Sequence, residues 1–323
     1  MPQARGCPRP IQARTPHSDP LPMNPGAVIR ALRPHQWVKN VFVLAALFFS
    51  GGEGSAHTTA DVLITILAVA AFCLGSSTIY LVNDIMDVES DRRHPDKCKR
   101  PIAAGELSIP AAWVLSFFCL LGSLGIAFKV GGSPFSMVWI VGAYVAVNFL
   151  YSIKLKHVVL VDAFCIAAGF LFRVQGGALA IGVPVSHWLF LCTLFLALFL
   201  ALCKRKAESD LLGDDAGGHR KILLEYNSAF LDQMVTLLAA CTIIAYTMYT
   251  VSADTVPKFG ENHILVWTVP FVVFGLGRYL LLVQTQKGGG SPTKVLLGGD
   301  LAFALNAVGW VAVVAISLYR PFG

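Results

Sequence analysis

The strongest constraint in this sequence is a series of apolar runs, each long enough to cross a lipid bilayer. An α-helix needs about 20 mostly apolar residues to span the hydrocarbon core, and runs of about 17–25 residues meet that requirement. The runs cover residues 36–52, 61–82, 110–130, 134–153, 157–178, 184–203, 229–251, 263–284 and 298–319. Because a chain in lipid must satisfy its own backbone hydrogen bonds, they predict an all-α polytopic membrane protein with about nine transmembrane helices.

The rest of the composition agrees with a membrane protein and excludes several soluble classes. Charged residues make up 14% of the 323 residues, whereas soluble domains have roughly 25%. Residues 1–25 lack the apolar core of a signal peptide, so we expect a flexible N-terminal arm before a single transmembrane domain at 26–323. The sequence has no Walker A loop, Rossmann fingerprint, nucleophile elbow or zincin motif, and no basic soluble module for nucleic acid.

The distribution of lysine and arginine predicts the orientation in the membrane. If the N-terminus is inside, the connections after the second, fourth, sixth and eighth runs share the cytoplasmic side with it. Those segments hold most of the basic residues, whereas the opposite side holds Lys129, Lys258 and Arg320. The positive-inside rule therefore predicts a cytoplasmic N-terminus and an external C-terminus.

The most informative polar segment, residues 83–101, follows the second apolar run. On a helix, Asp84, Asp87 and Asp91 are spaced i, i+3, i+7 and share one face, with Asn83 beside them. Carboxylates on one face repel one another unless cations lie between them, and Mg²⁺ prefers such oxygen ligands together with phosphate. We expect a metal site here for a phosphorylated substrate; the alternative is a solvated helix end of mixed charge.

Further polar candidates lie on the same predicted face. Cations on several separate segments suit a substrate with more than one phosphate group, although the first segment is also typical of a basic membrane anchor. The candidates for substrate binding are Arg33, Lys39 and Asn40 before the first run, Asn83, Lys97 and Arg100 after the second, Tyr151, Lys154 and Lys156 after the fourth, and Lys204, Arg205, Glu208, Arg220 and Tyr226 after the sixth.

Two charges interrupt the apolar run at 157–178. Asp162 and Arg173 are eleven residues apart, so they point the same way but are separated by about 16 Å along the helix axis. An ionisable residue inside a membrane usually has a partner or a function. We expect Asp162, near the cytoplasmic end, to face the polar cavity, while Arg173 is open to either a structural or a substrate role.

These motifs resemble those of a known family. The pattern Asn83-Asp84-x-x-Asp87-x-x-x-Asp91, followed by Arg100-Pro101-Ile102-x-x-Gly105, resembles the first Asp-rich motif of the UbiA-type intramembrane prenyltransferases. The segments 33–40, 151–156 and 204–208 resemble those of its decaprenyl-phosphate phosphoribosyltransferase branch. The second acidic motif departs from the family, since a basic run with Glu208 and a loose Asp210-x-x-x-Asp214 stands there. The number of metals, and the roles of these three acids, stay open.

The resemblance implies a nine-helix fold and a transferase. It implies Mg²⁺-dependent transfer of 5-phosphoribose from phosphoribosyl pyrophosphate to a polyprenyl phosphate, towards the lipid-linked arabinose donor of cell-wall arabinan. Such an enzyme is expected in the bacterial inner membrane with its site facing the cytoplasm; the sequence leaves an oligomer and the lipid chain length open. Asn83, Asp84, Asp87 and Asp91 would hold metal, and we expect Asp162 to stabilise charge developing on the ribose.

Two other functions are compatible with the pattern. The first is prenyl transfer from a polyprenyl diphosphate to an aromatic acceptor of a quinone or haem pathway, which needs fewer cations. The second is transport of a phosphorylated solute, for which broken helices meeting at the bilayer midplane are typical. The polar residues gather at one membrane face instead, which favours an enzyme.

Overall fold

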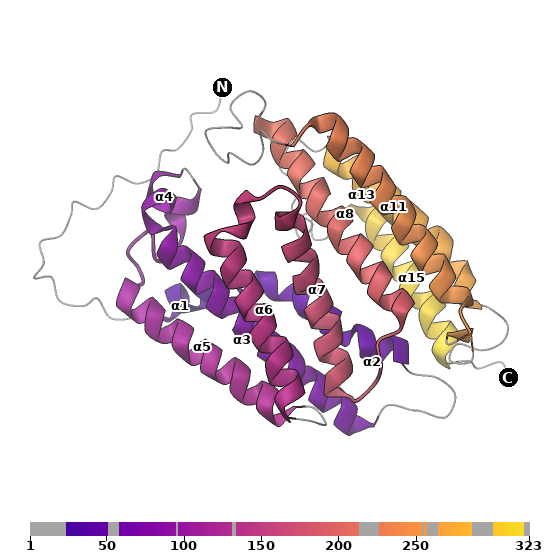
Figure 1. Cartoon of the computed structure of the whole chain (residues 1–323), viewed down its shortest axis with the longest axis horizontal. Coiled ribbons are helices and arrows are strands. Elements are labelled where there is room, and N and C mark those ends of the chain that lie inside the picture. Colours follow the sequence, from indigo (N-terminus) through magenta and orange to yellow (C-terminus); the bar gives the residue numbers. More distant parts are fainter. Residues whose placement is uncertain are drawn as a thin grey trace, which may run out of the picture.

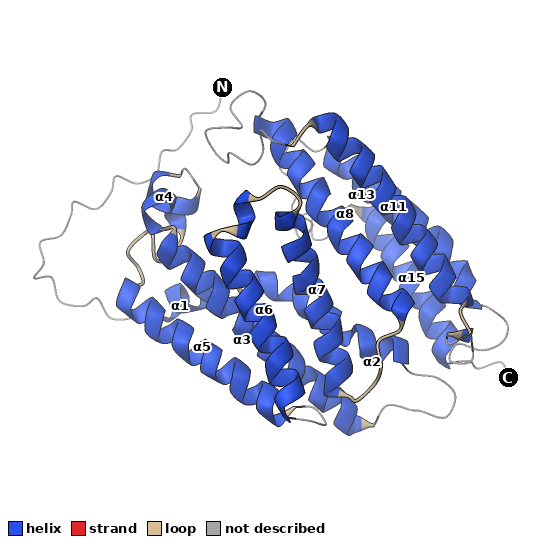
Figure 2. Ribbon diagram, viewed as in Figure 1, coloured by secondary structure: helices blue, strands red, loops and turns tan. Residues whose placement is uncertain are grey.

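The computed structural model describes residues 24–50, 58–94, 96–130, 134–212, 226–253, 255–256, 264–285 and 300–319. Within these ranges the regular elements are all helices (Figures 1 and 2), which confirms the all-α prediction. Nearly all of the predicted N-terminal arm lies outside the described residues. The elements are α1 (Pro25–Leu32), η1 (Pro34–Leu44), α2 (Ala45–Ser50), α3 (Thr59–Met86), α4 (Val88–Arg93), η2 (Lys97–Lys99), α5 (Ile109–Lys129), α6 (Pro134–Ile153), η3 (Leu155–His157), α7 (Val161–Ala180), α8 (His187–Leu212), α11 (Ser228–Val251), η5 (Ile264–Thr268), α13 (Val269–Thr285) and α15 (Leu301–Tyr319).

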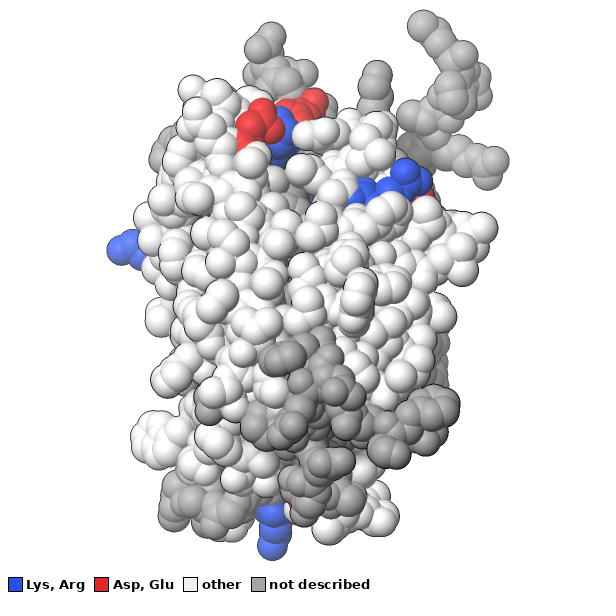
Figure 3. Space-filling model, turned by 90° about the vertical axis from the view of Figure 1, so that its right-hand side faces the viewer, with Lys and Arg blue, Asp and Glu red and all other residues white. Residues whose placement is uncertain are grey.

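The long helices agree with the apolar runs. Seven helices in the described part of the chain are long and apolar enough to cross a membrane, and an eighth apolar helix, Leu301–Ser317, is shorter. The face in Figure 3 carries its charged side chains mainly towards the two ends, with an almost uncharged band between them. On α5, Phe117 and Phe118 are 61% and 62% exposed. Such surfaces suit lipid, and the chain is a multi-pass membrane protein.

The first predicted run is wrong as a single helix, and a count of nine spans is not confirmed. Residues 34–44 form the 3-10 helix η1, and α2 adds only Ala45–Ser50. The segment begins at Pro34. The residue before it, Arg33, has a left-handed backbone (φ 54°). Two polar side chains of the segment are held inside the protein: Asn40 is fully buried, and Trp37 Nε1 donates to Ser77 Oγ. These internal contacts fix η1 against the bundle.

Helix starts follow ordinary capping chemistry. Thr58 and Asp61 form a capping box at the start of α3, in which each side chain accepts from the other residue's backbone N–H. Ser108 caps α5 and Asn227 caps α11 in the same manner, with side-chain oxygens accepting from backbone N–H groups. The sequence thus marks three of the spanning helices at their first residues.

Helix α7 lies between two apolar cores. One core contains Val43 of η1, Phe72 of α3 and Val141 of α6; the other is formed mainly by α8, α11 and α13. Close approach of η1 depends on Gly177 of α7, where a Cβ would lie 1.9 Å from the Val43 carbonyl oxygen. A residue without a side chain is therefore required for η1 to pack against α7.

The polar segments gather at one end of the bundle, as predicted. The end of α3 with α4, the connection from α6 to α7, and the end of α8 all lie at the upper end in Figure 1. These elements carry the acidic residues 84–91 and the candidate cations Lys154, Lys156, Lys204 and Arg205.

Candidate active site

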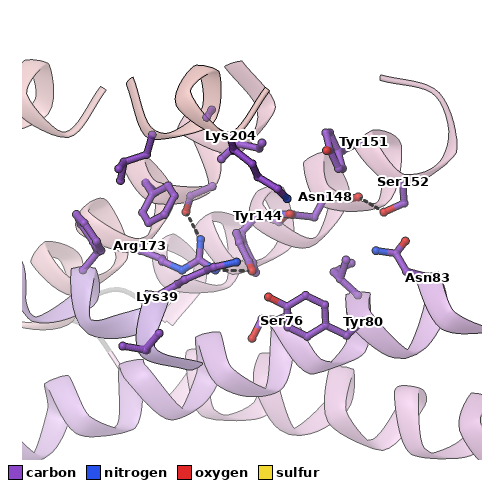
Figure 4. Close-up of a pocket in the computed structure, with 18 of the residues that line it drawn as sticks. Lys39, Ser76, Tyr80, Asn83, Tyr144, Asn148, Tyr151, Ser152, Arg173 and Lys204 are labelled. Atoms are coloured by element: carbon purple, nitrogen blue, oxygen red, sulfur yellow. Dashed lines mark hydrogen bonds between the residues drawn. The ribbon is translucent and has the colours of Figure 1, made fainter. Parts of the chain in front are cut away.

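A cavity of about 360 Å³ opens between η1, α3, α6, α7 and α8. Its apolar lining includes Phe42, Ile166, Phe170 and Leu200. Its polar lining (Figure 4) consists of Lys39, Ser76, Tyr80, Asn83, Tyr144, Asn148, Tyr151, Ser152, Arg173 and Lys204. Three of these side chains are cationic and none is a carboxylate, so the cavity suits a ligand that is anionic in part and apolar in part.

Two buried aspartates and two arginines form a cluster beside the cavity. Asp84 and Asp91 are 2% and 1% exposed. Arg100 Nη1 donates to Asp84 Oδ1 at 3.1 Å and to Asp91 Oδ2 at 2.6 Å, and Arg33 Nη2 also donates to Asp84 Oδ1. Asn83, the residue before Asp84, lines the cavity itself. The predicted proximity of Asp84 and Asp91 is therefore present, with Arg33 and Arg100 balancing their charge.

The donor set at this cluster fits a hard divalent cation that also binds phosphate. Asp91 Oδ1 is buried and has no hydrogen-bond partner among the described residues, which is an unusual state for a carboxylate oxygen. No group of three or more His, Cys, Asp or Glu in the described residues could hold a metal alone. Mg²⁺ does not need one, because it is usually bound by one or two carboxylates together with water and substrate phosphates.

Asp87 differs from the other two aspartates. Helix α3 ends at Met86, and Asp87 is the junction residue before α4. Its side chain is 41% exposed and lies 3.8 Å from Lys156 Nζ. The expectation of three carboxylates on one continuous helical face is wrong, because the helix breaks at Asp87 and turns this side chain towards the connection after α6.

Arg173 lies within the cavity lining and is 6% exposed. Its guanidinium donates to Asn40 Oδ1 at 2.7 Å, the Gly169 carbonyl oxygen at 2.7 Å and Tyr144 Oη at 2.9 Å. Its carbon Cζ also lies 4.7 Å from the centre of the Tyr144 ring. Arg173 is thus held rigidly by neutral partners, and Asn40 acts as one of its supports.

Asp162 lies outside the cavity lining, contrary to expectation. It is fully buried; Arg205 Nε donates to its Oδ2 at 2.7 Å, and Tyr226 Oη donates to its Oδ1 at 2.6 Å. Burial and this hydrogen bond raise the pKa of Tyr226, so its hydroxyl stays a donor. Both oxygens of Asp162 are thereby engaged, and the geometry does not support a direct contact with a ribose ring.

The residues around Asp162 instead contact side chains that line the cavity. Arg205 is 1% exposed and also binds Glu208, while its Nη2 donates to Tyr151 Oη at 3.4 Å. Glu208 in turn lies 3.6 Å from Lys204 Nζ. Tyr151 and Lys204 line the cavity. Arg205, Glu208 and Tyr226 do not line it, but Arg205 contacts Tyr151 and Glu208 contacts Lys204.

The remaining predicted cations differ in position. Lys97 and Lys154 are exposed and do not line the cavity. Lys156 is also outside the lining, and its Nζ lies 3.8 Å from Asp87 Oδ1. Arg220 and Asp214 lie outside the described residues.

Sequence reasoning missed several polar residues of the cavity. Tyr144, Asn148 and Ser152 lie on α6 at i, i+4, i+8, and Ser76 and Tyr80 lie one turn apart on α3. Each was hidden inside an apolar run. Their helical spacing forms a polar stripe on each helix, and a search for polar periodicity within the runs would have found them.

Comparison with known proteins shows the family and the fold of this chain. The sequence is 35% identical to decaprenyl-phosphate phosphoribosyltransferase of Corynebacterium glutamicum over 90% of this chain and 86% of that protein. It is 33% identical to the protein of the same name from Mycolicibacterium smegmatis, over 90% of this chain and 92% of that one. The solved structure of a UbiA homolog from Archaeoglobus fulgidus bound to GPP and Mg²⁺ has the same fold (TM-score 0.67, 18% identity, 90% of this chain and 99% of that chain). The model of the UbiA prenyltransferase family matches residues 40–317, and this chain belongs to that family.

Proposed function

We propose that this protein transfers 5-phosphoribose from phosphoribosyl pyrophosphate to a polyprenyl phosphate and releases pyrophosphate, in a Mg²⁺-dependent reaction. The named activity of its relatives from Corynebacterium glutamicum and Mycolicibacterium smegmatis supports this proposal. The product would feed synthesis of the lipid-linked arabinose donor. The reaction would take place at the cytoplasmic side of a bacterial inner membrane.

One structural observation carries the proposal. A carboxylate cluster, Asp84 with Asp91, lies next to a cavity that contains three cations, Lys39, Arg173 and Lys204, at one end of a transmembrane bundle. Carboxylates suit a metal-bound pyrophosphate, whereas the cations suit phosphate groups that carry no metal. The apolar part of the cavity suits the first isoprene units of a lipid.

The residues of this chain have distinct roles in such a reaction. Arg33 and Arg100 would bind the pyrophosphate, because both already lie on the carboxylates that it would approach. When bound, Mg²⁺ held by Asp84, Asp91 and Asn83 would neutralise charge on the leaving group. The bond from C1 to the pyrophosphate oxygen breaks, and an oxygen of the lipid phosphate forms the new bond to C1. That oxygen is already anionic at neutral pH, so no general base is required.

Two incubations of the purified protein with Mg²⁺ test the proposal. The first contains labelled phosphoribosyl pyrophosphate and polyprenyl phosphate, and the second contains prenyl diphosphate and labelled 4-hydroxybenzoate. We expect label to enter the lipid phase only in the first mixture. Label entering the lipid phase only in the second would overturn the proposal in favour of aromatic prenyl transfer.

A further inference from the structure

The cavity contains a buried positive charge that forms no ion pair with an acidic residue in the described part of the chain. Arg173 is more than nine-tenths buried, and it forms no ion pair with any described residue. The acceptors that hold it, Asn40, Gly169 and Tyr144, are all neutral. A buried cation without a counter-charge is costly, and in membrane proteins it usually marks a binding function.

The hydrogen bonds of Arg173 leave donors available to a ligand. A guanidinium has five N–H donors, and three of the hydrogen bonds of Arg173 are to protein, one from each nitrogen. Its plane is further fixed by Tyr144 and by Phe170, whose ring centre lies 5.5 Å from Cζ. The group is therefore preorganised, keeps its charge and retains two N–H donors.

Two lysines reinforce the same positive region. Lys39 of η1 and Lys204 of α8 enter the cavity with Arg173 (Figure 4). Lys39 forms no ion pair within the described residues, and Lys204 has only the distant Glu208 oxygen at 3.6 Å. The hydroxyl-bearing side chains of Ser76 and Tyr80 line the same wall. Charge and neutral donors thus converge from four elements on one space.

This positive region differs from the carboxylate cluster in what it can bind. A metal-bound phosphate needs carboxylates nearby, and none lines the cavity. A free phosphate monoester carries close to two negative charges at neutral pH and is bound well by converging lysine and arginine donors.

We propose that Lys39, Arg173 and Lys204 form a metal-independent subsite for a phosphate monoester, separate from the Asp84 and Asp91 cluster. The proposal rests on the proposed function in one respect, because that reaction supplies two such groups: the 5-phosphate of the ribose donor and the phosphate of the lipid acceptor. The subsite would orient a substrate by distinguishing its metal-free phosphate from its metal-bound pyrophosphate.

Direct binding without metal tests this subsite. The purified protein is titrated in EDTA with ribose 5-phosphate in one arm and with geranylgeranyl phosphate in the other. We expect the wild type to bind one of them, and Lys39→Gln to weaken that binding roughly 10-fold to 100-fold through loss of one charged hydrogen-bond donor. The arm that responds identifies the source of the phosphate. A melting curve checks that the Lys39→Gln variant is folded.

Two controls separate charge from structure. Lys99→Gln removes one positive charge from the same end of the molecule at a side chain that is 69% exposed, and it should leave binding unchanged. Arg173→Lys keeps the charge but loses the fork of donors, and we expect an intermediate loss of affinity. Equal affinity in wild type and Lys39→Gln for both ligands, or binding that requires Mg²⁺, would overturn the subsite. The protein could bind one of these ligands without metal, in a manner that depends on Lys39, and yet transfer no phosphoribose. That result would overturn only the proposed function.

Discussion

At the scale of single residues, the carboxylate cluster and the cavity beside it differ in how their charges are balanced. Asp84 and Asp91 are neutralised by Arg33 and Arg100, whereas Arg173 has only neutral partners. The carboxylates are therefore balanced within their own cluster, whereas no described acidic residue pairs with Arg173. In the proposed reaction, the cluster would hold a metal-bound pyrophosphate and Arg173 would bind a phosphate that carries no metal.

The unpartnered oxygen of Asp91 gives a prediction about metal binding. Asp91→Asn replaces a buried carboxylate by a neutral amide, so Mn²⁺ used as a probe for Mg²⁺ should bind about tenfold or more weakly in the presence of pyrophosphate. Electron paramagnetic resonance of free Mn²⁺ measures this. Asp96→Asn, at an 84% exposed carboxylate on the same end, is the matched control. Unchanged Mn²⁺ affinity in Asp91→Asn would mean that this carboxylate is not a ligand.

The two hydrogen bonds of Tyr226 give a prediction about stability. Tyr226→Phe removes the donor to Asp162 and leaves the Leu160 N–H, which donates to Tyr226 Oη at 2.8 Å, without an acceptor. We expect a loss of about 1–3 kcal/mol in the free energy of unfolding, measured by thermal denaturation in detergent.

The pH dependence of that loss follows from the raised pKa of Tyr226. A hydroxyl whose folded-state pKa is raised stabilises the fold fully below the ordinary tyrosine value of about 10 and progressively less above it. The difference in stability between wild type and Tyr226→Phe should stay constant from about pH 6 to 9 and shrink above pH 10. A difference that grows with rising pH would contradict this assignment.

At the scale of elements, the site depends on how η1 packs against α7. Lys39 lines the cavity and Asn40 supports Arg173. Both positions depend on the packing of nearby Val43, whose carbonyl oxygen approaches Gly177 too closely for any side chain there. Gly177→Ala should therefore displace η1, cost about 1–3 kcal/mol of stability and abolish substrate binding. Gly142→Ala is the matched control, because a Cβ there meets nothing within 4 Å. Normal binding by Gly177→Ala would show that η1 does not position the site.

Hydropathy predicted the long helices well because lipid imposes one strong requirement on every spanning segment. It failed for residues 36–52, where the polar side chains of η1 are satisfied inside the protein by partners distant in sequence, such as Ser77. The sequence spacing predicted correctly that Asp84 and Asp91 lie close together, but it could not show that α3 ends before Asp87. The predicted position of Asp162 in the cavity was wrong for a related reason, since its partners Arg205 and Tyr226 are distant in sequence and hold its side chain away from the lining.

At the scale of the whole molecule, the proposed reaction requires that the polar end of the bundle face the cytoplasm. Lys97 lies at that end and Lys129 at the opposite end of α5. Cysteines introduced as Lys97→Cys and Lys129→Cys should differ in intact cells: a membrane-impermeant maleimide should label only the second above the wild-type background. Labelling of Lys97→Cys alone would reverse the orientation.

The most direct measurement of the central claim is Mg²⁺-dependent transfer of labelled phosphoribose into polyprenyl phosphate by wild type and by Asp84→Asn. The carboxylate of Asp84 joins Arg33 and Arg100 at the site where pyrophosphate would leave. We predict transfer by the wild type and at least about a hundredfold lower rate in a folded Asp84→Asn protein, because a preorganised charge at the reacting groups is lost. Full Mg²⁺-dependent transfer by folded Asp84→Asn would contradict the account.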